Sequence, residues 1–401
     1  MNISSNIKFN VLFQGPVMNR SGYGVASDLI AHALLKYPRF ALLTVPLNWG
    51  NCITRQTVGP WDNEIKATFS RSKGPIPQPH IELQCTMPGI QSPQGSIYNI
   101  TMNAGVETNK APDHFLKGIN GFDLTIVPSN HTKQTYLNSD IKPTKPIEIL
   151  PWSVNTDIYK IDALADDKID AVMNNVSESQ CFLFTGQITN GNASLDRKDI
   201  LNLVKTFCET FKGKDNKPAL ILKTSGTSYS YIDRNQIIEM IKNEKDKIAS
   251  DVNVYVLHGE LSETQMASLN SHKKIIAHIS FTHGEGFGLP LLEFSLSGKP
   301  IIVSNWSGHL DFLEDKFIPL EGSVDVISKQ LESEYFPSGS SWFNVDTQKA
   351  TKTLLDFYYG DRTESNKLAM ILAKENAKKY TVDRFVSRLH NILDKHLLGV
   401  N

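Results

Sequence analysis

The sequence has few of the features that mark secreted, membrane-spanning or metal-binding proteins. It contains four cysteines in 401 residues, at positions 52, 85, 181 and 208. They are widely spaced and form no C-x-x-C pair, which argues against a zinc site and a disulfide framework. No apolar run approaches the roughly 18–20 residues of a membrane span, and the polar start carries no signal-peptide pattern. These absences predict a cytoplasmic protein without an integral membrane segment.

A large net charge is also missing. The chain carries 41 Lys and Arg against 42 Asp and Glu. It therefore has no overall field that would attract nucleic acid. The first 150 residues hold 13 basic and 9 acidic residues, so the excess of acid lies in the remainder. This asymmetry is either ordinary scatter or the sign of a first domain that meets an anionic acceptor.

Length and residue pattern predict two α/β domains. A chain of 401 residues is too long for one ordinary core and suits two domains of about 150–200 residues each. Short β-branched runs alternate with helical stretches, which is the pattern of parallel sheets. In the first half we expect strands over 8–13, 41–46, 96–102 and 124–127, with helices over 22–35 and from about 130. Residues 50–96 are rich in Pro and Gly and are interpreted as an elaborated surface region or binding loop.

The second half repeats the alternation after a linker at 151–157. We expect strands over 181–185, 219–224, 252–257, 275–280 and 301–304, with helices over 198–211, 235–248, 262–272, 291–297 and 364–398. The predicted architecture is two Rossmann-like domains, residues 1–150 and 151–380, facing a central cleft. A C-terminal helix, 381–401, is expected to pack back on the first domain. Ligands of such sheets bind beyond the carboxyl ends of the strands.

Residues 11–16, Val-Leu-Phe-Gln-Gly-Pro, coincide with the recognition sequence of a protease used to remove tags. They are either an engineered remnant or native sequence. We favour native sequence, because the run ending at Phe13 is typical of a first strand and Gly15-Pro16 of the turn after it.

The segment from His283 to Glu293 carries the clearest chemistry. Its three glycines lie between a predicted strand and a helix that Pro290 can begin. Glycine lets backbone amides approach a ligand, and a helix N-terminus favours phosphate oxygens. Glu285 and Glu293 are acceptor-only carboxylates that suit the hydroxyls of a sugar and a ribose. The simpler alternative is a tight turn before a helix with a favourable glutamate in its first turn.

This segment, together with Ser297-Gly-Lys-Pro-Ile-Ile-Val-Ser304, resembles the donor-site signature of family 4 retaining glycosyltransferases, including the E-x7-E spacing. The resemblance covers nearly the whole second half, with the domain entry at 151–157 and the strand–glycine–helix unit at 256–262. It implies the GT-B fold, in which the first domain binds the acceptor and the second binds a nucleotide sugar.

The resemblance also implies residue roles in the donor domain. Arg197 and Lys198 would neutralise the leaving diphosphate, with a solvated helix start as the alternative. Lys223 is a third cation, and His258 would contact the nucleobase. Without the resemblance, His258 is equally well explained as an ordinary core or surface histidine. The complete set of donor residues implied in this domain is Arg197, Lys198, Lys223, His258, Leu261, Glu285, Gly286, Phe287, Gly288, Leu289 and Glu293.

In the first domain, Gly15, Gly22 and Gly24 form a Gly-rich turn that lacks the spacing of the dinucleotide fingerprint. In GT-B enzymes this turn faces the diphosphate and sugar, and the alternative is an ordinary glycine-rich loop. The histidine that many family members carry after a mid-domain strand is absent here. Glu107 is our substitute for acting on the acceptor hydroxyl or holding it, against the alternative of a solvated carboxylate. The remaining acceptor candidates are Tyr23, Ser129 and Lys133.

The resulting hypothesis is a retaining hexosyl- or pentosyltransferase that uses a nucleoside diphosphate sugar, with UDP as the expected nucleotide. The sequence offers no protein nucleophile and no well-placed D-x-D, so we expect neither a metal nor a cofactor. The glycine-rich turn and Gly105-Val-Glu-Thr108 look similar to a branch common in bacteriophage genomes, which would place the protein in the host cytoplasm.

The acceptor is open. Some phage enzymes of this kind modify hydroxymethylated pyrimidines in DNA, and duplex DNA would suit the basic first domain through phosphate contacts. The basic residues of its long loop are Arg55, Lys66, Arg71 and Lys73. Saccharides or surface polymers are the alternative acceptors. Two alternative hypotheses from other functional classes are that the protein is a nucleotide-sugar 2-epimerase or a non-catalytic GT-B binding module.

Overall fold

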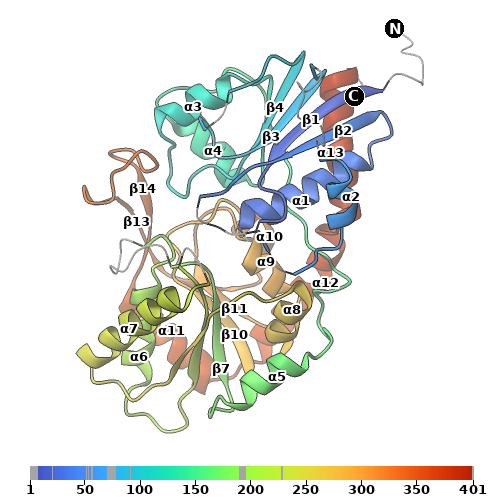
Figure 1. The fold of residues 1–401 in the computed structure, drawn as a ribbon. Coiled ribbons are helices and arrows are strands. Elements are labelled where there is room, and N and C mark those ends of the chain that lie inside the picture. Colours follow the sequence, from blue (N-terminus) through green and yellow to red (C-terminus); the bar gives the residue numbers. More distant parts are fainter. Residues whose placement is uncertain are drawn as a thin grey trace. The chain divides into compact units, whose positions relative to one another are not determined.

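The computed structural model describes residues 8–19, 21–50, 52, 54–55, 57–69, 78–90, 92–188, 196–226 and 229–399. They divide into two compact units. Unit 1 is Met1–Ser153 with Ser333–Pro337 and Tyr380–Asn401, and unit 2 is Val154–Glu332 with Ser338–Lys379. Each unit contains one six-stranded parallel sheet flanked by helices (Figure 1). This confirms the predicted α/β class with two Rossmann-like domains.

The sheet of unit 1 has the strand order β2-β1-β3-β4-β5-β6. Its strands are β1 (Phe9–Gly15), β2 (Phe40–Pro46), β3 (Ile81–Cys85), β4 (Tyr98–Met102), β5 (Leu124–Val127) and β6 (Ile147–Ile149). Its helices before the linker are α1 (Gly22–Leu35), α2 (Asp62–Lys66), α3 (Asp113–Asn120) and α4 (Asn130–Asn138). The order reverses between β1 and β3, which is where ligands of doubly wound sheets bind.

Strand β3 corrects the interpretation of residues 50–96 as one long surface region. All five of its residues are buried, and it pairs with β1 on one side and β4 on the other. Its apolar residues alternate with Glu82 and Gln84. The Glu82 carboxylate accepts hydrogen bonds from the side-chain amides of Gln14 at 2.7 Å and Gln84 at 2.6 Å, and from the Gln94 amide at 2.7 Å. Because these donors satisfy the buried Glu82 carboxylate, a strand forms where the sequence shows only a brief apolar run.

The segment that coincides with a protease recognition sequence belongs to the fold. Val11 to Gly15 lie in β1, which pairs with β2 and β3 and therefore has no free edge. Val11 and Phe13 are buried. A flexible remnant would have no reason to occupy a central strand, so residues 11–15 are an integral part of unit 1.

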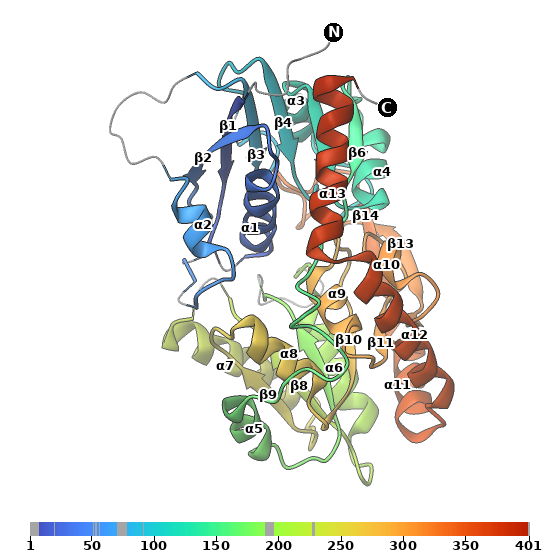
Figure 2. The same ribbon diagram turned by 90° about the vertical axis from the view of Figure 1, so that its right-hand side faces the viewer.

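Helix α13 (Val382–Leu393) packs against α1 in unit 1 (Figure 2). The His390 Nε2 atom lies 2.8 Å from the Ala33 carbonyl oxygen, and the Tyr37 hydroxyl donates to Asp394. Asp394 begins a π-helical turn, η1 (Asp394–Leu398). The single helical stretch predicted for 364–398 is thus divided, with α12 (Thr363–Lys379) in unit 2 and α13 in unit 1.

The sheet of unit 2 has the order β12-β11-β10-β7-β8-β9. Its strands are β7 (Cys181–Thr185), β8 (Ala219–Lys223), β9 (Val254–Leu257), β10 (Ile275–Ser280), β11 (Ile301–Ser304) and β12 (Ile318–Leu320). The further helices are α5 (Asp167–Asn174), α6 (Ile200–Phe211), α7 (Tyr231–Lys247), α8 (Glu263–Ser271), α9 (Leu289–Ser295), α10 (Leu310–Leu313) and α11 (Thr347–Tyr359). A two-stranded antiparallel hairpin, β13 (Gly322–Val326) and β14 (Ser341–Val345), was not predicted.

The core of unit 2 is aromatic. Phe182 of β7 contacts Phe207 and Phe211 of α6, with ring centroids 5.4 and 6.3 Å apart. These apolar side chains fix α6 on the sheet, and with it the residues that precede the helix.

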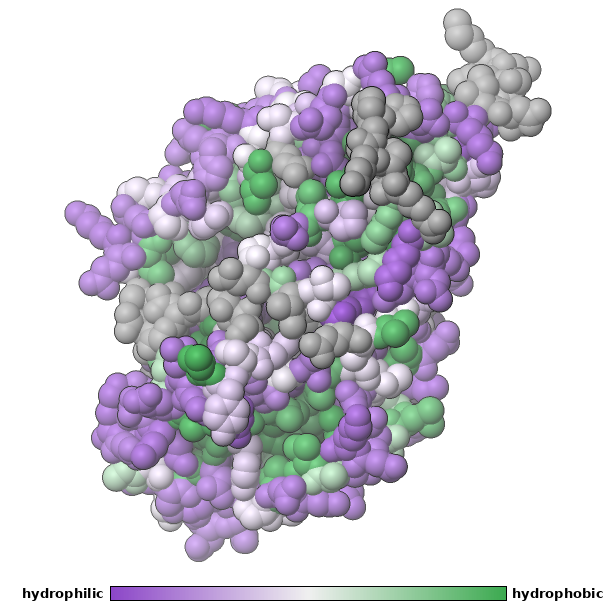
Figure 3. All heavy atoms as spheres, viewed as in Figure 1, coloured by the Kyte–Doolittle hydropathy of each residue, from purple (hydrophilic) through white to green (hydrophobic). Residues whose placement is uncertain are grey.

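Most of the face drawn in Figure 3 is hydrophilic, in purple, with smaller hydrophobic groups in green. Among the described residues, no helix is both long and apolar enough to cross a membrane.

Candidate functional site

The candidate site of unit 2 lies where its strand order reverses. β7 and β10 are neighbours in the sheet, and the chain leaves them toward helices on different sides of this point. The loop after β7 leads to Arg197 and Lys198, and residues 189–195 of it lie outside the described part of the chain. The loop after β10 carries Glu285. Because the carboxyl ends of parallel strands share one edge, the two loops meet although they are distant in sequence.

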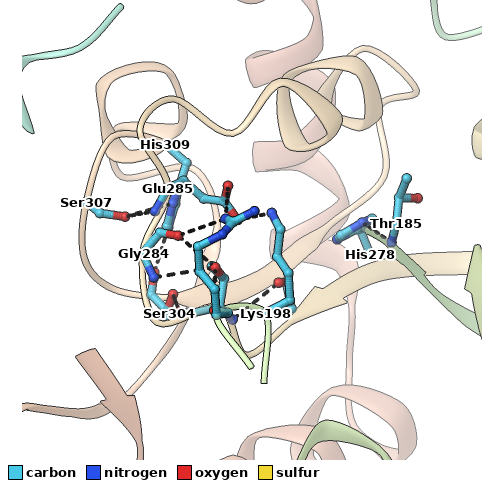
Figure 4. A network of polar contacts seen from close by, with 11 residues as sticks. Thr185, Lys198, His278, Gly284, Glu285, Ser304, Ser307 and His309 are labelled. Carbon is cyan, nitrogen blue, oxygen red and sulfur yellow. Dashed lines mark hydrogen bonds and ion pairs between the residues drawn. The ribbon is translucent and has the colours of Figure 1, made fainter. Parts of the chain in front are cut away.

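Glu285 pairs with both cations (Figure 4). The Lys198 ammonium donates to the Glu285 Oε1 atom, and the Arg197 guanidinium lies 3.4 Å from Oε2. The Glu285 and Lys198 side chains are 8% and 9% exposed, whereas that of Arg197 is 26% exposed. The cluster of these three residues is therefore buried at the lysine and partly exposed at the arginine.

The charges at this point keep Glu285 ionised. Burial alone raises the pKa of its carboxyl, but the positive charges of Lys198 and Arg197 outweigh burial and lower the pKa to about 2. His278 of β10 lies near the same ammonium. Burial, together with the charge of Lys198, lowers the pKa of His278 to about 3, so its ring is neutral. The site therefore presents one fixed carboxylate and two cations at neutral pH.

The Glu285 backbone is held by the turn after β11. The Glu285 amide donates to the Ser307 hydroxyl at 2.8 Å, and the Glu285 carbonyl accepts from the Gly308 amide at 2.9 Å. A side chain at Gly308 has no room, because its Cβ atom would lie 2.3 Å from the Gly286 carbonyl oxygen. The glycine of this turn is thus required by close approach of the two backbones.

The hairpin supports the start of the same loop. The His283 ring stacks on Trp342 of β14 with centroids 4.0 Å apart and an interplanar angle of 7°. The Phe343 amide donates to the His283 carbonyl at 3.1 Å, and the His283 amide donates to the Arg197 carbonyl at 2.9 Å. The loop after β10 is therefore tied both to the hairpin and to the segment that carries the cations.

The other predicted residues of the glycine-rich loop enter a short helix. Gly288 has φ +91° and precedes α9, which begins at Leu289. Phe287 is 3% exposed and packs on Phe312. Gly286 lies on the same loop, and Glu293 lies on α9. Glu293 is half-buried and lies in the second turn of the helix rather than in the first, because α9 begins at Leu289. The structure thus places this predicted set on one loop and one helix start, which is where backbone amides point outward.

Lys223, His258 and Leu261 lie at the ends of β8 and β9. The Lys223 ammonium donates to the Gly259 carbonyl at 2.7 Å. The His258 Nε2 atom lies 2.8 Å from the Asp233 Oδ2 atom of α7, and the His258 side chain is 4% exposed. Leu261 is half-buried. Asp233 fixes the His258 ring. The sequence around His258 gives no sign of this partner, because Asp233 lies on α7 and His258 follows β9.

In unit 1, two of the three predicted glycines have structural reasons. A Cβ atom at Gly24 would lie 2.1 Å from the Asn19 carbonyl oxygen, and one at Gly15 would lie 2.7 Å from the Ser27 hydroxyl. Gly22, by contrast, has no described atom within 4 Å of such a Cβ atom and is exposed. Of the three, Gly22 alone faces open space that a ligand can share.

Tyr23 and Glu107 both lie near the loop after β4. The Tyr23 hydroxyl accepts from the Ala104 amide at 3.0 Å, and the Tyr23 ring stacks on Trp49 with centroids 4.4 Å apart. Glu107 is half-buried three residues further along this loop. The structure therefore brings the catalytic candidate of unit 1 to the same loop as one acceptor candidate.

Ser129 and Lys133 belong to the start of α4. Ser129 is fully buried, and its hydroxyl accepts from the Thr132 amide at 3.1 Å as the N-cap of the helix. This capping geometry explains the serine without an acceptor. Lys133 is half-buried one turn later, where its amide donates to the Ser129 carbonyl at 3.2 Å. Their assignment to the acceptor stays a prediction, which the burial of Ser129 does not favour.

Arg55 does not have the free guanidinium expected of a phosphate contact. It donates to Asp28 of α1 and to Asp62 of α2, and its side chain is 9% exposed. Its backbone amide also donates to the Met18 carbonyl at 2.8 Å. Arg55 therefore ties the loop after β1 to both helices. Lys66 is exposed, whereas Arg71 and Lys73 lie outside the described residues.

Among known proteins, the chain has matches only in the comparison with solved structures. No protein-family profile matches the chain, and no curated protein matches it. Among solved structures, 388 chains match.

HepE of Anabaena, in complex with UDP and glucose, is 10% identical, covers 96% of this chain and 100% of its own, and has a TM-score of 0.60. A glycosyltransferase from Rickettsia africae is 16% identical, with coverage of 98% and 100% and a TM-score of 0.63. Sucrose-phosphate synthase from Thermosynechococcus elongatus is 12% identical, with coverage of 98% and 100% and a TM-score of 0.62. At these identities the likeness concerns the fold, which is GT-B.

Proposed function

We propose that the chain is a glycosyltransferase that takes its sugar from a nucleoside diphosphate sugar. The observation that carries this proposal is the meeting of Arg197 and Lys198 with Glu285 at the switch point of a parallel sheet. Two cations at the carboxyl edge of such a sheet suit a diphosphate, and a carboxylate that is ionised at neutral pH beside them suits sugar hydroxyls. The sequence resemblance to family 4 glycosyltransferases and the GT-B fold support the same activity.

The proposed reaction retains the anomeric configuration. The acceptor oxygen forms a bond to the anomeric carbon on the face from which the diphosphate departs. The bond from that carbon to the diphosphate oxygen breaks, and its electron pair stays on the diphosphate. The acceptor proton passes to a diphosphate oxygen. Arg197 and Lys198 stabilise the charge that develops on this leaving group, and electrostatic stabilisation of this kind is usually the largest single contribution to catalysis.

Glu285 then binds rather than exchanging protons. With its pKa lowered to about 2, the carboxylate has no proton to donate at neutral pH. It accepts hydrogen bonds from the sugar hydroxyls and orients the anomeric carbon. In unit 1 we assign Glu107 to hold the acceptor hydroxyl, with Tyr23 and Lys133 as acceptor ligands. Ser129 is left to its role as the N-cap of α4, and the glycine-rich turn after β1 stays a predicted part of the donor site.

The site assignment is tested by Glu285→Gln and Arg197→Ala. Both variants should lose at least about a hundredfold in turnover, because each removes a charged contact to the transition state. Arg384→Ala is the matched control, since this exposed arginine lies on α13 of unit 1. Turnover near that of the control in both variants would show that the donor site lies elsewhere.

We propose UDP as the nucleotide. HepE was solved with UDP and with UDP-glucose, and the chain shares its fold. A thermal-shift screen with UDP, GDP and ADP tests this choice directly. Stabilisation by GDP or ADP alone would replace UDP in the proposal. Independence of metals and cofactors stays a prediction, checked by turnover in excess EDTA, and so does a cytoplasmic location.

The acceptor class follows from a second experiment. Duplex DNA with hydroxymethylated pyrimidines is one candidate, and saccharides or surface polymers are the other. DNA binding through phosphates would weaken steeply with salt, with a slope set by the number of contacts. Because Arg55 is engaged with two buried carboxylates, few basic contacts of the predicted loop remain among the described residues. Transfer to a saccharide, with salt-independent turnover, would select the second class.

Two other classes share the fold and are separated by product analysis. A nucleotide-sugar 2-epimerase returns an altered nucleotide sugar, whereas a transferase releases the free nucleoside diphosphate. A non-catalytic GT-B module binds the donor and changes nothing. Incubation with UDP-glucose and a mixture of acceptors, followed by detection of both UDP and any altered nucleotide sugar, distinguishes all three.

A further inference from the structure

The turn after β11 contains a backbone strain that the sequence does not require. Ser307 has φ +90°, in the left-handed region that favours glycine. The next residue is a glycine, so the turn could place glycine at both positions. A serine held in this conformation costs of order 1–3 kcal/mol and persists only when its surroundings hold it there. Its side chain must therefore contribute something that glycine cannot.

The Ser307 hydroxyl belongs to a chain of hydrogen bonds whose direction can be assigned (Figure 4). The His309 Nε2 atom lies 2.8 Å from the Ser304 carbonyl oxygen, which can only accept, so Nε2 carries the proton. Burial lowers the pKa of His309, so its ring is neutral and Nδ1 is an acceptor. The Ser307 hydroxyl, 3.4 Å away, therefore points its proton at Nδ1. Its oxygen then accepts the Glu285 amide at 2.8 Å.

His309 also supports the other end of the loop. A Cβ atom at Gly288 would lie 3.0 Å from the His309 Cβ atom, so the two backbones pack closely. His309 is fully buried. One side chain thus holds the amide of Glu285 through Ser307 and backs Gly288 directly, and the loop between them can move little.

We propose that Ser307 and His309 are positioning residues of the donor site, which hold the Glu285 backbone so that its carboxylate faces Lys198 and Arg197. The inference rests on the proposed function. A diphosphate that binds the two cations competes with the Glu285 carboxylate for them, and the carboxylate then turns toward the sugar. With the backbone fixed at Glu285, this exchange needs only side-chain rotation. Neither residue touches the substrate in this arrangement.

Three variants of the full chain test the proposal. Ser307→Ala and Ser307→Gly both remove the hydroxyl, but only glycine relieves the strained φ angle. His309→Phe replaces the imidazole with an aromatic ring that has no polar atoms. Ser268→Ala is the matched control, because the Ser268 hydroxyl of α8 is also buried and also accepts a backbone amide, from Asp166 at 3.0 Å.

The first readout needs no ligand. Amide hydrogen exchange of the peptide containing Glu285 to Leu289 should accelerate about tenfold in the three variants, since each loses the restraint of about one hydrogen bond. The control should leave this peptide unchanged. Ser307→Gly should unfold at the wild-type temperature or above it, so a faster exchange cannot be attributed to general destabilisation. Unchanged exchange in Ser307→Gly and His309→Phe would overturn the proposal.

The second readout is affinity for UDP-glucose, measured by calorimetry. The dissociation constant for UDP-glucose should rise about tenfold in both Ser307 variants alike, because Glu285 holds the sugar and the effect follows the hydroxyl rather than the strain. Faster exchange with unchanged UDP-glucose affinity would also overturn the inference, since the residues would then order the loop without serving the site. A wild-type protein that binds no UDP would instead contradict the proposed nucleotide, and with it the role of the two residues in a UDP site. That failure is seen in the wild type alone, so it is distinct from a failure seen only in the variants.

Discussion

Replacing Glu285 by glutamine should change the pH dependence of stability in a defined way. Glutamine has the shape of the protonated acid and cannot ionise. In the folded protein the neighbouring cations outweigh burial and lower the pKa of Glu285 from 4.5 to about 2. At about 1.4 kcal/mol per pH unit, this difference corresponds to roughly 3 kcal/mol of stability at neutral pH. Glu285→Gln should therefore be less stable than the wild type by about this amount at pH 7.

The sign of the effect sets the pH window. Because the pKa is lower in the folded state, the stabilisation is complete above pH 4.5 and is lost as the pH falls toward 2. The difference in free energy of unfolding between wild type and variant should thus shrink by about 1.4 kcal/mol per pH unit across this window. Near pH 2 the two proteins should become equally stable, apart from a constant offset between the amide and the protonated acid.

Urea unfolding followed by circular dichroism, from pH 7 to pH 2, measures this difference. Glu239→Gln is the control, because Glu239 is exposed on α7 of the same unit. Surface changes of this kind alter stability by less than about 0.5 kcal/mol. A Glu285→Gln variant as stable as wild type at pH 7, or a difference that stays constant down to pH 3, would refute the ion pairing on which the site is built.

Three further outcomes are expected. Arg55→Met should destabilise unit 1 by about 3 kcal/mol, measured by urea unfolding, because it leaves two buried carboxylates unpaired. The same variant should leave any binding to duplex DNA unchanged, and weaker DNA binding would restore the role of Arg55 as a phosphate contact. Gly24→Ala should lower the melting temperature, because its Cβ atom would lie 2.1 Å from a backbone oxygen, whereas Gly22→Ala has open space and should be tolerated; equal melting temperatures would contradict the geometry. The tag-removing protease should cleave the bond between Gln14 and Gly15 only in denaturant, because this bond lies in a central strand; rapid cleavage of the native protein would show that β1 is accessible.

Much of the fold could be predicted from local patterns. The strands Leu124–Val127, Cys181–Thr185, Ile275–Ser280 and Ile301–Ser304 and the helix Gly22–Leu35 have the predicted bounds. These elements have clear periodicity or dense β-branched runs, bounded by turn residues, and short windows of sequence encode such signals. They are enough to predict alternating strands and helices, and hence parallel sheets in two domains.

The errors arise where partners outside the window decide the structure. β3 has a glutamate and a glutamine in its five residues, and it is a strand because Gln14 and Gln94 satisfy the carboxylate. The hairpin β13–β14 was missed because β13 is wholly exposed and has no buried face to produce a pattern. Arg55 looked like a surface cation because its two acidic partners lie on separate helices.

The same division applies to the candidate site. The sequence by itself determined that a glycine-rich loop with Glu285 leads into a helix and that a basic pair precedes another helix. Only the tertiary structure brought Lys198 to Glu285 across 87 residues, and only it revealed Ser307, His309 and Trp342 as supports of that loop. The reason is that helices and strands form from interactions between near neighbours in sequence. Which loops meet depends instead on the order of strands in the sheet, and that order follows from the packing of the whole unit.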